Sequence, residues 1–205
     1  MNNYFIILAS GQSKRFNLNN PKQYFTYKNK PLFEHSIEKA LASKLFKKII
    51  LVVSNKKQIN KKFPKNVITI KGGKERSDSS LIGLKYIKKF KPSNVLIHDA
   101  ARPNFSIRLL RNLVKLLKTN RAVIPTINTK DSIKYKVKNQ LFNLNRDHSF
   151  LTQTPQAFRF NDLYNLSTKQ KNKIQDEASL FIENNCKIKL IKGENLNSKI
   201  TYKED

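Results

Sequence analysis

The chain has 205 residues, which is enough to bury the hydrophobic core of one domain. Hydrophobic residues make up 39% of it, including 13 Phe and 7 Tyr, and this content argues against a disordered protein. The net charge of +27 is typical of proteins that bind nucleic acids. However, the basic residues are spread along nearly the whole chain, without a zinc-finger, RNA-recognition or helix-turn-helix signature. We therefore expect nonspecific adhesion to polyanions at low salt and no specific nucleic-acid partner.

The sequence also indicates where the protein works. No apolar run approaches the ~20 residues needed to cross a bilayer. The first strand begins almost at once, with no basic segment or apolar signal core before it. The single cysteine, Cys186, excludes an internal disulfide framework and a zinc cluster, and we expect it to be a small packed side chain. These features predict a cytoplasmic protein without a membrane partner.

Apolar patterns predict strands that alternate with helices. Pro31 is expected at the first position of a helix that continues with apolar residues at helical spacing through Leu41. Buried strands are predicted at residues 4–8, 49–53, 67–70, 94–97 and 122–125, and further helices at residues 77–90 and 107–117. This order implies an α/β domain with a doubly wound, mostly parallel sheet over residues 1–205, in which ligands bind beyond the carboxyl ends of the strands.

The pattern changes at residues 132–146. Apolar and lysine residues alternate from Ile133 to Lys138, and Asn139-Gln140 offers a turn before a second apolar run. We expect a hairpin that protrudes from the domain as an arm over about residues 130–148. Because an isolated two-stranded ribbon is marginally stable, this arm is expected to lean on a partner.

Three loops at predicted strand ends carry groups suited to a nucleotide. Leu8-Ala9-Ser10-Gly11 follows the first strand, where backbone N–H groups of small residues can hold phosphate or a base, and Arg15 and Lys22 bring two cations to the same loop. The glycine spacing fits neither a P-loop nor a dinucleotide-binding fingerprint. Taken alone, Ser10-Gly11 could equally be an ordinary turn.

The second loop is Gly72-Gly73-Lys74, where we expect close backbone approach, and Ser77 to Ser79 is expected to cap the following helix. The third is His98-Asp99 with Arg102. Asp99 could hold a divalent metal or sugar hydroxyls, while Arg102 could pair with phosphate or position Asp99. A structural Asp–Arg pair is the alternative, and His98 is expected to be a packed or hydrogen-bonded side chain.

The ordered set of motifs resembles the 2-C-methyl-D-erythritol 4-phosphate cytidylyltransferases of the non-mevalonate isoprenoid pathway. The motifs are Leu-Ala-Ser-Gly with Lys-Arg-Phe, Pro-Lys-Gln-Tyr, Gly-Gly-x-Glu-Arg-x-Asp-Ser, His-Asp-Ala-Ala-Arg-Pro, Thr-Pro-Gln-Ala-Phe and Asp-Glu-Ala-Ser, and the match runs over residues 5–199. The resemblance implies a Rossmann-like nucleotidyltransferase fold and a homodimer. It also implies cytidylyl transfer from CTP to methylerythritol phosphate, with release of pyrophosphate, and a requirement for Mg²⁺ held mainly by the CTP phosphates.

The resemblance also assigns residues. Arg15 and Lys22 match the two transition-state stabilisers of the family. The nucleotide-binding positions fall on Leu8, Ala9, Ser10, Gly11, Gly73, Lys74, Ser79 and Ala100. The substrate-binding positions fall on Asp99, Arg102, Ser132, Arg146, Thr154 and Lys199, of which Ser132 and Arg146 match residues that reach the site of the neighbouring subunit. No side chain is assigned to a metal.

The chain departs from the family pattern at Ser13, Ser132 and Gln175, where Gly, Thr and Thr respectively are more usual, and each change could alter affinity. It also stops at Asp205, where family members continue into a final helix, so we expect truncation, disorder beyond this point, or removal from a longer, fused protein. Two functional alternatives remain open. One is a cytidylyltransferase for another sugar-alcohol phosphate, such as ribitol 5-phosphate, and the other is a nonenzymatic RNA-binding protein.

Overall fold

The computed structural model describes residues 1–11, 21–59, 61–170 and 174–202. Its centre is an eight-stranded sheet with the order β10-β7-β11-β6-β1-β4-β5, in which β12 also pairs with β7. The strands are β1 (Asn3–Ala9), β4 (Lys48–Val53), β5 (Val67–Lys71), β6 (Asn94–Asp99), β7 (Ala122–Asn128), β10 (Phe150–Thr152), β11 (Gln156–Arg159) and β12 (Lys189–Lys192). The predicted α/β fold with a mostly parallel sheet is confirmed.

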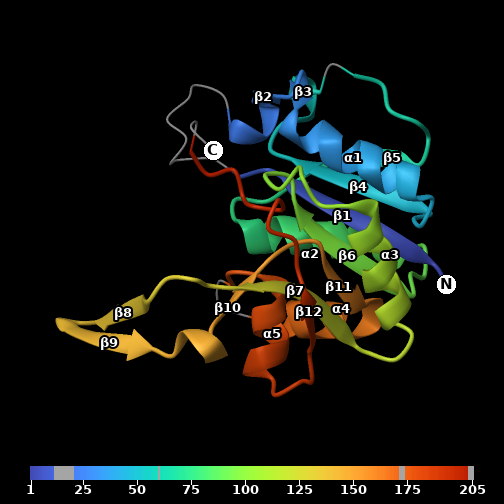
Figure 1. Ribbon diagram of the computed structural model, residues 1–205. Coiled ribbons are helices and arrows are strands. Elements are labelled where there is room, and N and C mark those ends of the chain that lie inside the picture. The colour runs from blue at the N-terminus through green and yellow to red at the C-terminus, as the bar shows by residue number, and fades with distance from the viewer. Residues whose placement is uncertain (12–20, 60, 171–173, 203–205) are drawn as a thin grey trace.

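Helices cover both faces of this sheet (Figure 1). They are α1 (Leu32–Ser43), α2 (Arg76–Lys88), α3 (Ile107–Leu116), α4 (Phe160–Lys169) and α5 (Glu177–Glu183). Helices α1 and α3 pack on one face, and α2, α4 and α5 pack on the other. The longest helix in the described part of the chain has 13 residues, and none there is long and apolar enough to cross a membrane.

The alternation of side chains along the central strands explains these two cores. In β1, Phe5 and Ile7 point into the core beneath α1 and α3, whereas Tyr4 and Ile6 point toward α2. Because both faces are buried, the strand contains an uninterrupted apolar run of the kind that parallel strands require. Strand β4 repeats the pattern, and this is why the sequence predicted both strands.

The hairpin formed by β8 (Ile133–Val137) and β9 (Gln140–Leu144) projects away from the sheet (Figure 1). Tyr135 and Phe142 are opposite each other in its register, and their rings stack at a centroid distance of 5.1 Å. The predicted turn at Asn139-Gln140 is one residue too late. Gln140 already pairs with Val137, and Lys138 takes the left-handed conformation with φ 51°.

Several other boundaries and elements differ from the prediction. Helix α1 begins at Leu32, and Pro31 is its N-cap and the last residue of the short strand β3 (Lys30–Pro31), which pairs with β2 (Thr26–Tyr27). Helices α2 and α3 end two residues and one residue before their predicted limits. The sequence analysis did not predict α4, α5, β10, β11 or β12, nor the short 3-10 helices η1 (Lys22–Tyr24), η2 (Lys56–Gln58) and η3 (Arg146–His148).

Candidate active site

Most of the predicted site residues meet at one edge of the sheet. Strands β1, β4, β5 and β6 run parallel, so their carboxyl ends lie together. Ser10 follows β1, Gly72 and Gly73 follow β5, and Asp99 ends β6. Strand β11 runs antiparallel to β6, which brings Thr154, just before β11, to the same edge. This is where the fold predicts a ligand.

A buried hydroxyl pair joins the first two loops. Ser79 lies in the first turn of α2 with no exposed surface, and its Oγ lies 2.6 Å from Oγ of Ser10. The same Ser79 oxygen accepts from the Gly73 N–H at 3.1 Å. The segment from Ser77 to Ser79 contributes to the helix cap through Asp78, because α2 begins with a capping box in which Glu75 is the N-cap and its N–H donates to the carboxylate of Asp78 at 3.0 Å. Ser79 itself fixes the distance between the two loops.

The two glycines between β5 and α2 are required by this close packing. A Cβ at Gly72 would lie 2.7 Å from Oγ of Ser79, and one at Gly73 would lie 2.4 Å from Cβ of Asp78. Both are closer than real Cβ contacts allow. Lys74 follows them and is exposed. The loop therefore combines a backbone packed against Ser79 with a cation in solvent.

Asp99 lies at the centre of a charged cluster. Its Oδ1 accepts from Nε of Arg76 at 2.9 Å, and its Oδ2 accepts from Nζ of Lys199 at 2.7 Å. Arg76 also donates through both Nη atoms to Glu177, at 2.9 and 3.0 Å. Burial alone would raise the pKa of Asp99, but the two cations hold that pKa well below its ordinary value. The carboxylate is therefore ionised at neutral pH.

His98 is a structural residue, as predicted. It is fully buried, and its ring lies against Phe5 and Phe105 at centroid distances of 5.6 and 4.5 Å. Burial lowers the pKa of His98 to about 3, so the ring is neutral at neutral pH. The Asp99 N–H donates to Oγ1 of Thr154 at 3.0 Å, and that oxygen lies 3.1 Å from Nδ1 of His98. Thr154 thus connects the end of β6 to the core.

The segment at residues 197–200 lies beside the end of β6 and contacts two more of the predicted cations. Arg102 donates through Nη1 to the Asn197 carbonyl at 2.8 Å, and Lys22 donates through Nζ to the Ile200 carbonyl at 2.8 Å. The Ile200 N–H donates to the Ala101 carbonyl at 2.9 Å. Asp99 forms its ion pairs with Arg76 and Lys199, so the alternative of a structural pair between Asp99 and Arg102 is not observed.

Ala100 is buried directly after Asp99, and its N–H donates to the Leu8 carbonyl at 3.1 Å. Leu8 and Ala9 are the buried last residues of β1, and the Gly11 carbonyl accepts from Nε2 of Gln23 at 3.0 Å. The end of β1 is thus held by a backbone contact with Ala100, and Gly11 is held by the side chain of Gln23. Arg15 and Ser13 lie outside the described residues.

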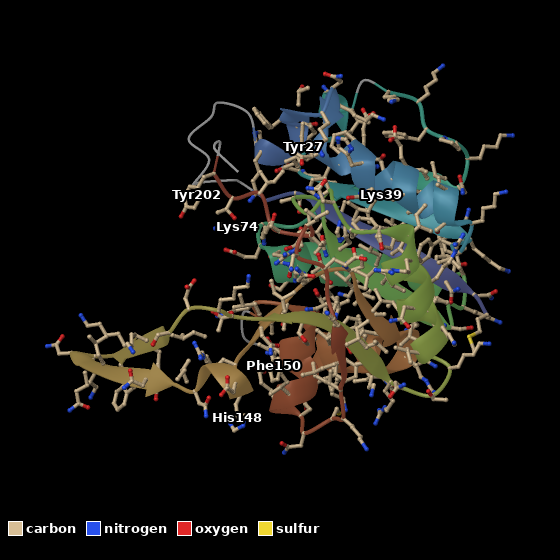
Figure 2. All side chains as sticks on the ribbon, in the orientation of Figure 1. Tyr27, Lys39, Lys74, His148, Phe150 and Tyr202 are labelled. Carbon is tan, nitrogen blue, oxygen red and sulfur yellow. The ribbon has the colours of Figure 1, made fainter. Side chains whose placement is uncertain are left out.

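Ser132 and Arg146 lie at the base of the hairpin. Both are exposed, and the side chain of Arg146 is 62% exposed. Its contacts are weak, with Nη1 at 3.5 Å from the Lys130 carbonyl and Nε at 3.8 Å from Oδ1 of Asp147. Within the described part of this chain, the polar contacts of both residues stay within the hairpin and its base, away from the Asp99 cluster. Figure 2 shows Lys74 and Tyr202 on the side of the molecule from which the hairpin also projects, with His148 and Phe150 near its base.

Sequence reasoning missed Arg76 and Glu177 as site residues. Both lie inside motifs that were recognised, Gly-Gly-x-Glu-Arg-x-Asp-Ser and Asp-Glu-Ala-Ser. The recurrence of both residues inside recognised motifs was the available signal. The second motif had received no role, although its glutamate contacts the same guanidinium as Asp99.

Over residues 1–11, 21–59, 61–170 and 174–202, no group of three or more His, Cys, Asp or Glu side chains converges to hold a metal. Both carboxylate oxygens of Asp99 already face cations.

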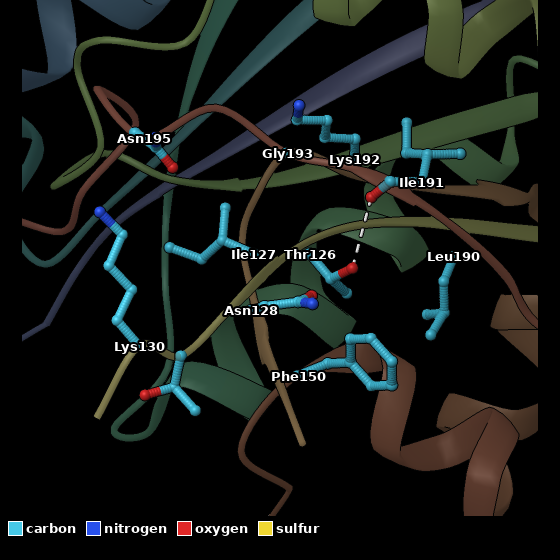
Figure 3. A pocket seen from close by; sticks show the side chains of 11 residues that line it. Thr126, Ile127, Asn128, Lys130, Phe150, Leu190, Ile191, Lys192, Gly193 and Asn195 are labelled. Atoms are coloured by element: carbon cyan, nitrogen blue, oxygen red, sulfur yellow. Dashed lines mark hydrogen bonds between the residues drawn. The ribbon is translucent and has the colours of Figure 1, made fainter. Parts of the chain in front are cut away.

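A cavity of about 520 Å³ lies further along the same edge, between the end of β7, β12 and the base of the hairpin (Figure 3). Phe150 and Leu190 form an apolar side, and Asn128 and Lys130 lie nearby. The Thr126 hydroxyl donates to the Ile191 carbonyl at 3.4 Å within its wall. None of the predicted site residues lines this cavity.

Comparison with known proteins agrees with the geometry. The family model of 2-C-methyl-D-erythritol 4-phosphate cytidylyltransferase matches residues 4–205. A protein of that name from Caldicellulosiruptor bescii is 35% identical, over 98% of this chain and 92% of that protein. A crystal structure of 4-diphosphocytidyl-2C-methyl-D-erythritol synthase from Anaerococcus prevotii superposes with a TM-score of 0.86 at 29% identity, covering 100% of this chain and 92% of that one.

A bifunctional enzyme IspD/IspF from Pelagibacter ubique is 50% identical over 207 residues, which cover 100% of this chain. The chain spans only 56% of the length of that relative. The matches to the family model and to the full-length relative nevertheless cover almost every residue of the chain. The chain belongs to the 2-C-methyl-D-erythritol 4-phosphate cytidylyltransferase family.

Proposed function

We propose that this chain transfers a cytidylyl group from CTP to 2-C-methyl-D-erythritol 4-phosphate and releases pyrophosphate, as a step of isoprenoid precursor synthesis in the cytoplasm. The observation that carries the proposal is the convergence of two kinds of group at one sheet edge. Ser10, Gly73 and Ser79 form a tight loop pair suited to a base and ribose. Asp99, Lys199 and Arg102 lie beside it and suit a phosphorylated polyol.

The proposed mechanism is an in-line attack of the substrate phosphate on the α-phosphorus of CTP. The nucleophile is already an anion, so no side chain has to act as a base, and the neutral, buried His98 is not required as one. Negative charge builds on the nonbridging oxygens and on the departing pyrophosphate, and fixed cations stabilise it. Lys22 is the described cation assigned to this role, together with Arg15.

Lys22 is held by a short helix and by a contact with the C-terminal segment. It begins the 3-10 helix η1, and its Nζ donates to the Ile200 carbonyl at 2.8 Å. This contact holds the ammonium group beside residues 197–200, which also contact Arg102 and Asp99. Mg²⁺ carried by the CTP phosphates would add positive charge to the transferring group. The chain itself supplies orientation and the protein cations.

We further propose that the protein acts as a homodimer whose hairpins complete the active sites. Apolar side chains of the hairpin and its base are exposed, with Leu141 at 71%, Val137 at 50%, Leu151 at 50% and Phe150 at 47%. Isolated ribbons are unstable, and such a concentration of exposed apolar groups favours an interface. A second copy is the proposed occupant, because a two-fold axis would let each hairpin cover the same surface of its partner.

The assay that tests the reaction measures pyrophosphate release from CTP with two acceptors. Turnover with methylerythritol phosphate, and at least about 100-fold lower kcat/KM with ribitol 5-phosphate, is the expected result; a discrimination of that size corresponds to about 2.7 kcal/mol. A preference for ribitol 5-phosphate would support the alternative acceptor. If no pyrophosphate is released with either acceptor and the protein binds RNA tightly at high salt, the nonenzymatic alternative would be supported.

The shared site is tested by mixing two inactive variants. Lys22→Ala and Arg146→Ala chains, each inactive alone, should regain activity when heterodimers form, since one site of each heterodimer then contains both intact residues. Mixing Lys22→Ala with a Lys22→Ala, Arg146→Ala double variant is the matched control and should stay inactive. An active monomer, or verified heterodimers without recovery, would contradict the proposal.

A further inference from the structure

The Asp-Glu-Ala-Ser motif at residues 176–179 has no role in the proposed reaction so far, although its glutamate lies close to the site. Glu177 is the first residue of α5 and has no exposed surface. Its two carboxylate oxygens accept from the two Nη atoms of Arg76 at 2.9 and 3.0 Å. A buried carboxylate is costly without a partner, and this bidentate arrangement supplies a strong one.

The remaining edge of the same guanidinium faces Asp99. Nε of Arg76 donates to Oδ1 of Asp99 at 2.9 Å, so one planar group connects the start of α5 to the end of β6. Lys199 approaches the other carboxylate oxygen at 2.7 Å. Two carboxylates and two cations make the cluster of Arg76, Asp99, Glu177 and Lys199 neutral in total. Asp99 is therefore held from both sides.

This arrangement leaves Asp99 able to accept further hydrogen bonds. Each carboxylate oxygen has two lone pairs, and one donor on each oxygen occupies only half of that capacity. The Asp99 side chain is 11% exposed, so it is open along a narrow edge. A carboxylate whose orientation is fixed at that edge suits the hydroxyl of a polyol, because the carboxylate does not have to rotate when it accepts the hydrogen bond.

Stability alone accounts poorly for such a cluster. A buried ion pair gains little over well-packed apolar side chains, because both charges lose their hydration. Arg76 and Glu177 could join α2 to α5 through their bidentate contact without any bond to Asp99. The additional Nε contact links this internal pair to the one carboxylate of the cluster that faces the site.

We infer that Arg76 and Glu177 are positioning residues that hold the Asp99 carboxylate in the orientation that binds a hydroxyl of the sugar-alcohol phosphate. The inference rests on the proposed function. Glu177 fixes the rotation of Arg76, and Arg76 fixes Asp99 without touching the substrate. Without the charge of Glu177, the guanidinium is expected to turn toward Asp99, its remaining counter-ion, and to occupy the acceptor sites that the substrate needs.

The test compares steady-state kinetics of Arg76→Lys, Glu177→Gln and an Arg76→Leu, Glu177→Leu double variant. Lysine keeps the charge but cannot bond in the same plane to both carboxylates. The double variant removes both buried charges together, so it avoids an unpaired charge while Lys199 still contacts Asp99. Arg121→Ala is the matched control, since it removes the exposed Arg121–Asp162 pair, which has no contact with the cluster in the described structure.

We expect the KM for methylerythritol phosphate to rise about tenfold or more in all three test variants, because loss of a supporting contact commonly weakens binding by that much. The KM for CTP should change less than about twofold. Glu177→Asp, which keeps the charge, should fall between wild type and Glu177→Gln. Arg121→Ala should match wild type in both KM values. Melting temperatures and circular dichroism report whether each variant is folded.

A folded double variant with the wild-type KM for methylerythritol phosphate would overturn the inference. So would a rise confined to the KM for CTP, because Arg76 would then shape the nucleotide loop at Gly73 and not the orientation of Asp99. Wild-type protein without turnover would overturn the proposed function and this inference with it. Wild-type turnover with unchanged variant KM values would overturn this inference alone.

Discussion

The buried His98 should make the stability of this protein depend on pH between about 5 and 7. Its ring is fully buried, and burial lowers its pKa from 6.5 to about 3. As the pH falls below 6.5, His98 therefore binds a proton in the unfolded chain but stays neutral in the folded chain. The stability associated with the neutral ring is fully present above pH 6.5 and is lost progressively toward pH 3.

The size of this loss of stability follows from the pH interval over which His98 is protonated only in the unfolded chain. One pKa unit corresponds to about 1.4 kcal/mol, so a fall from pH 6.5 to pH 5 should lower the free energy of unfolding by about 2 kcal/mol. Asp99 acts in the same direction, since its pKa is lowered in the fold, but its contribution is lost only below its ordinary value of 3.8. Restricting the measurement to pH 5 to 7 isolates His98 from Asp99.

Urea unfolding at pH 7 and at pH 5 measures the difference. His98→Asn should be less stable than wild type at pH 7, because the ring leaves a gap between Phe5 and Phe105, but its stability should change less between the two pH values. His148→Asn, at an exposed position, is the matched control and should keep the wild-type dependence. Equal pH dependence in wild type and His98→Asn would refute the reasoning.

Two further predictions concern the nucleotide side of the site. Lys22→Ala should lower kcat by about 100-fold or more with a smaller change in the KM for CTP, by analogy with loss of one charge-stabilising donor. Lys28→Ala, at an exposed position, is the control and should keep wild-type kinetics. Near-normal turnover of a folded Lys22→Ala protein would remove the catalytic assignment of Lys22. Ser79→Ala should lower the free energy of unfolding in urea by about 1 to 3 kcal/mol, because the Gly73 N–H and the Ser10 hydroxyl lose a buried partner. It should also raise the KM for CTP more than the KM for the acceptor. Ser149→Ala is its control, and an unchanged KM for CTP would contradict the loop's assignment to the nucleotide.

The sequence predicted the central sheet well because its strands are buried on both faces. Runs such as residues 49–53 contain only apolar side chains, which is the pattern that parallel strands require. The missed strands are different. Strand β12 has only two apolar residues between two lysines, and β10 has three exposed residues, so neither carries a buried run. Their pairing with β7 depends on the rest of the fold.

The candidate site was predictable where its residues lie next to strand ends. Asp99 and Ser10 could be placed from the strands that precede them, without knowledge of any long-range contact. Arg76 and Glu177 could not be paired in this way, because 101 positions separate them and their contact depends on how α2 and α5 pack on one face of the sheet. No local period in the sequence carries that information.

The electrostatics of the site divide its two tasks between different residues. The reaction brings together a triphosphate and a phosphate monoester, so it needs an excess of positive charge at the sheet edge. The cluster of Arg76, Asp99, Glu177 and Lys199 cannot provide that excess, because its two carboxylates balance its two cations. Lys22, Lys74 and Arg102 lie outside this cluster, and we propose that they supply the excess positive charge. Attraction of phosphate and orientation of hydroxyls are thus assigned to separate groups, so a change in one need not disturb the other.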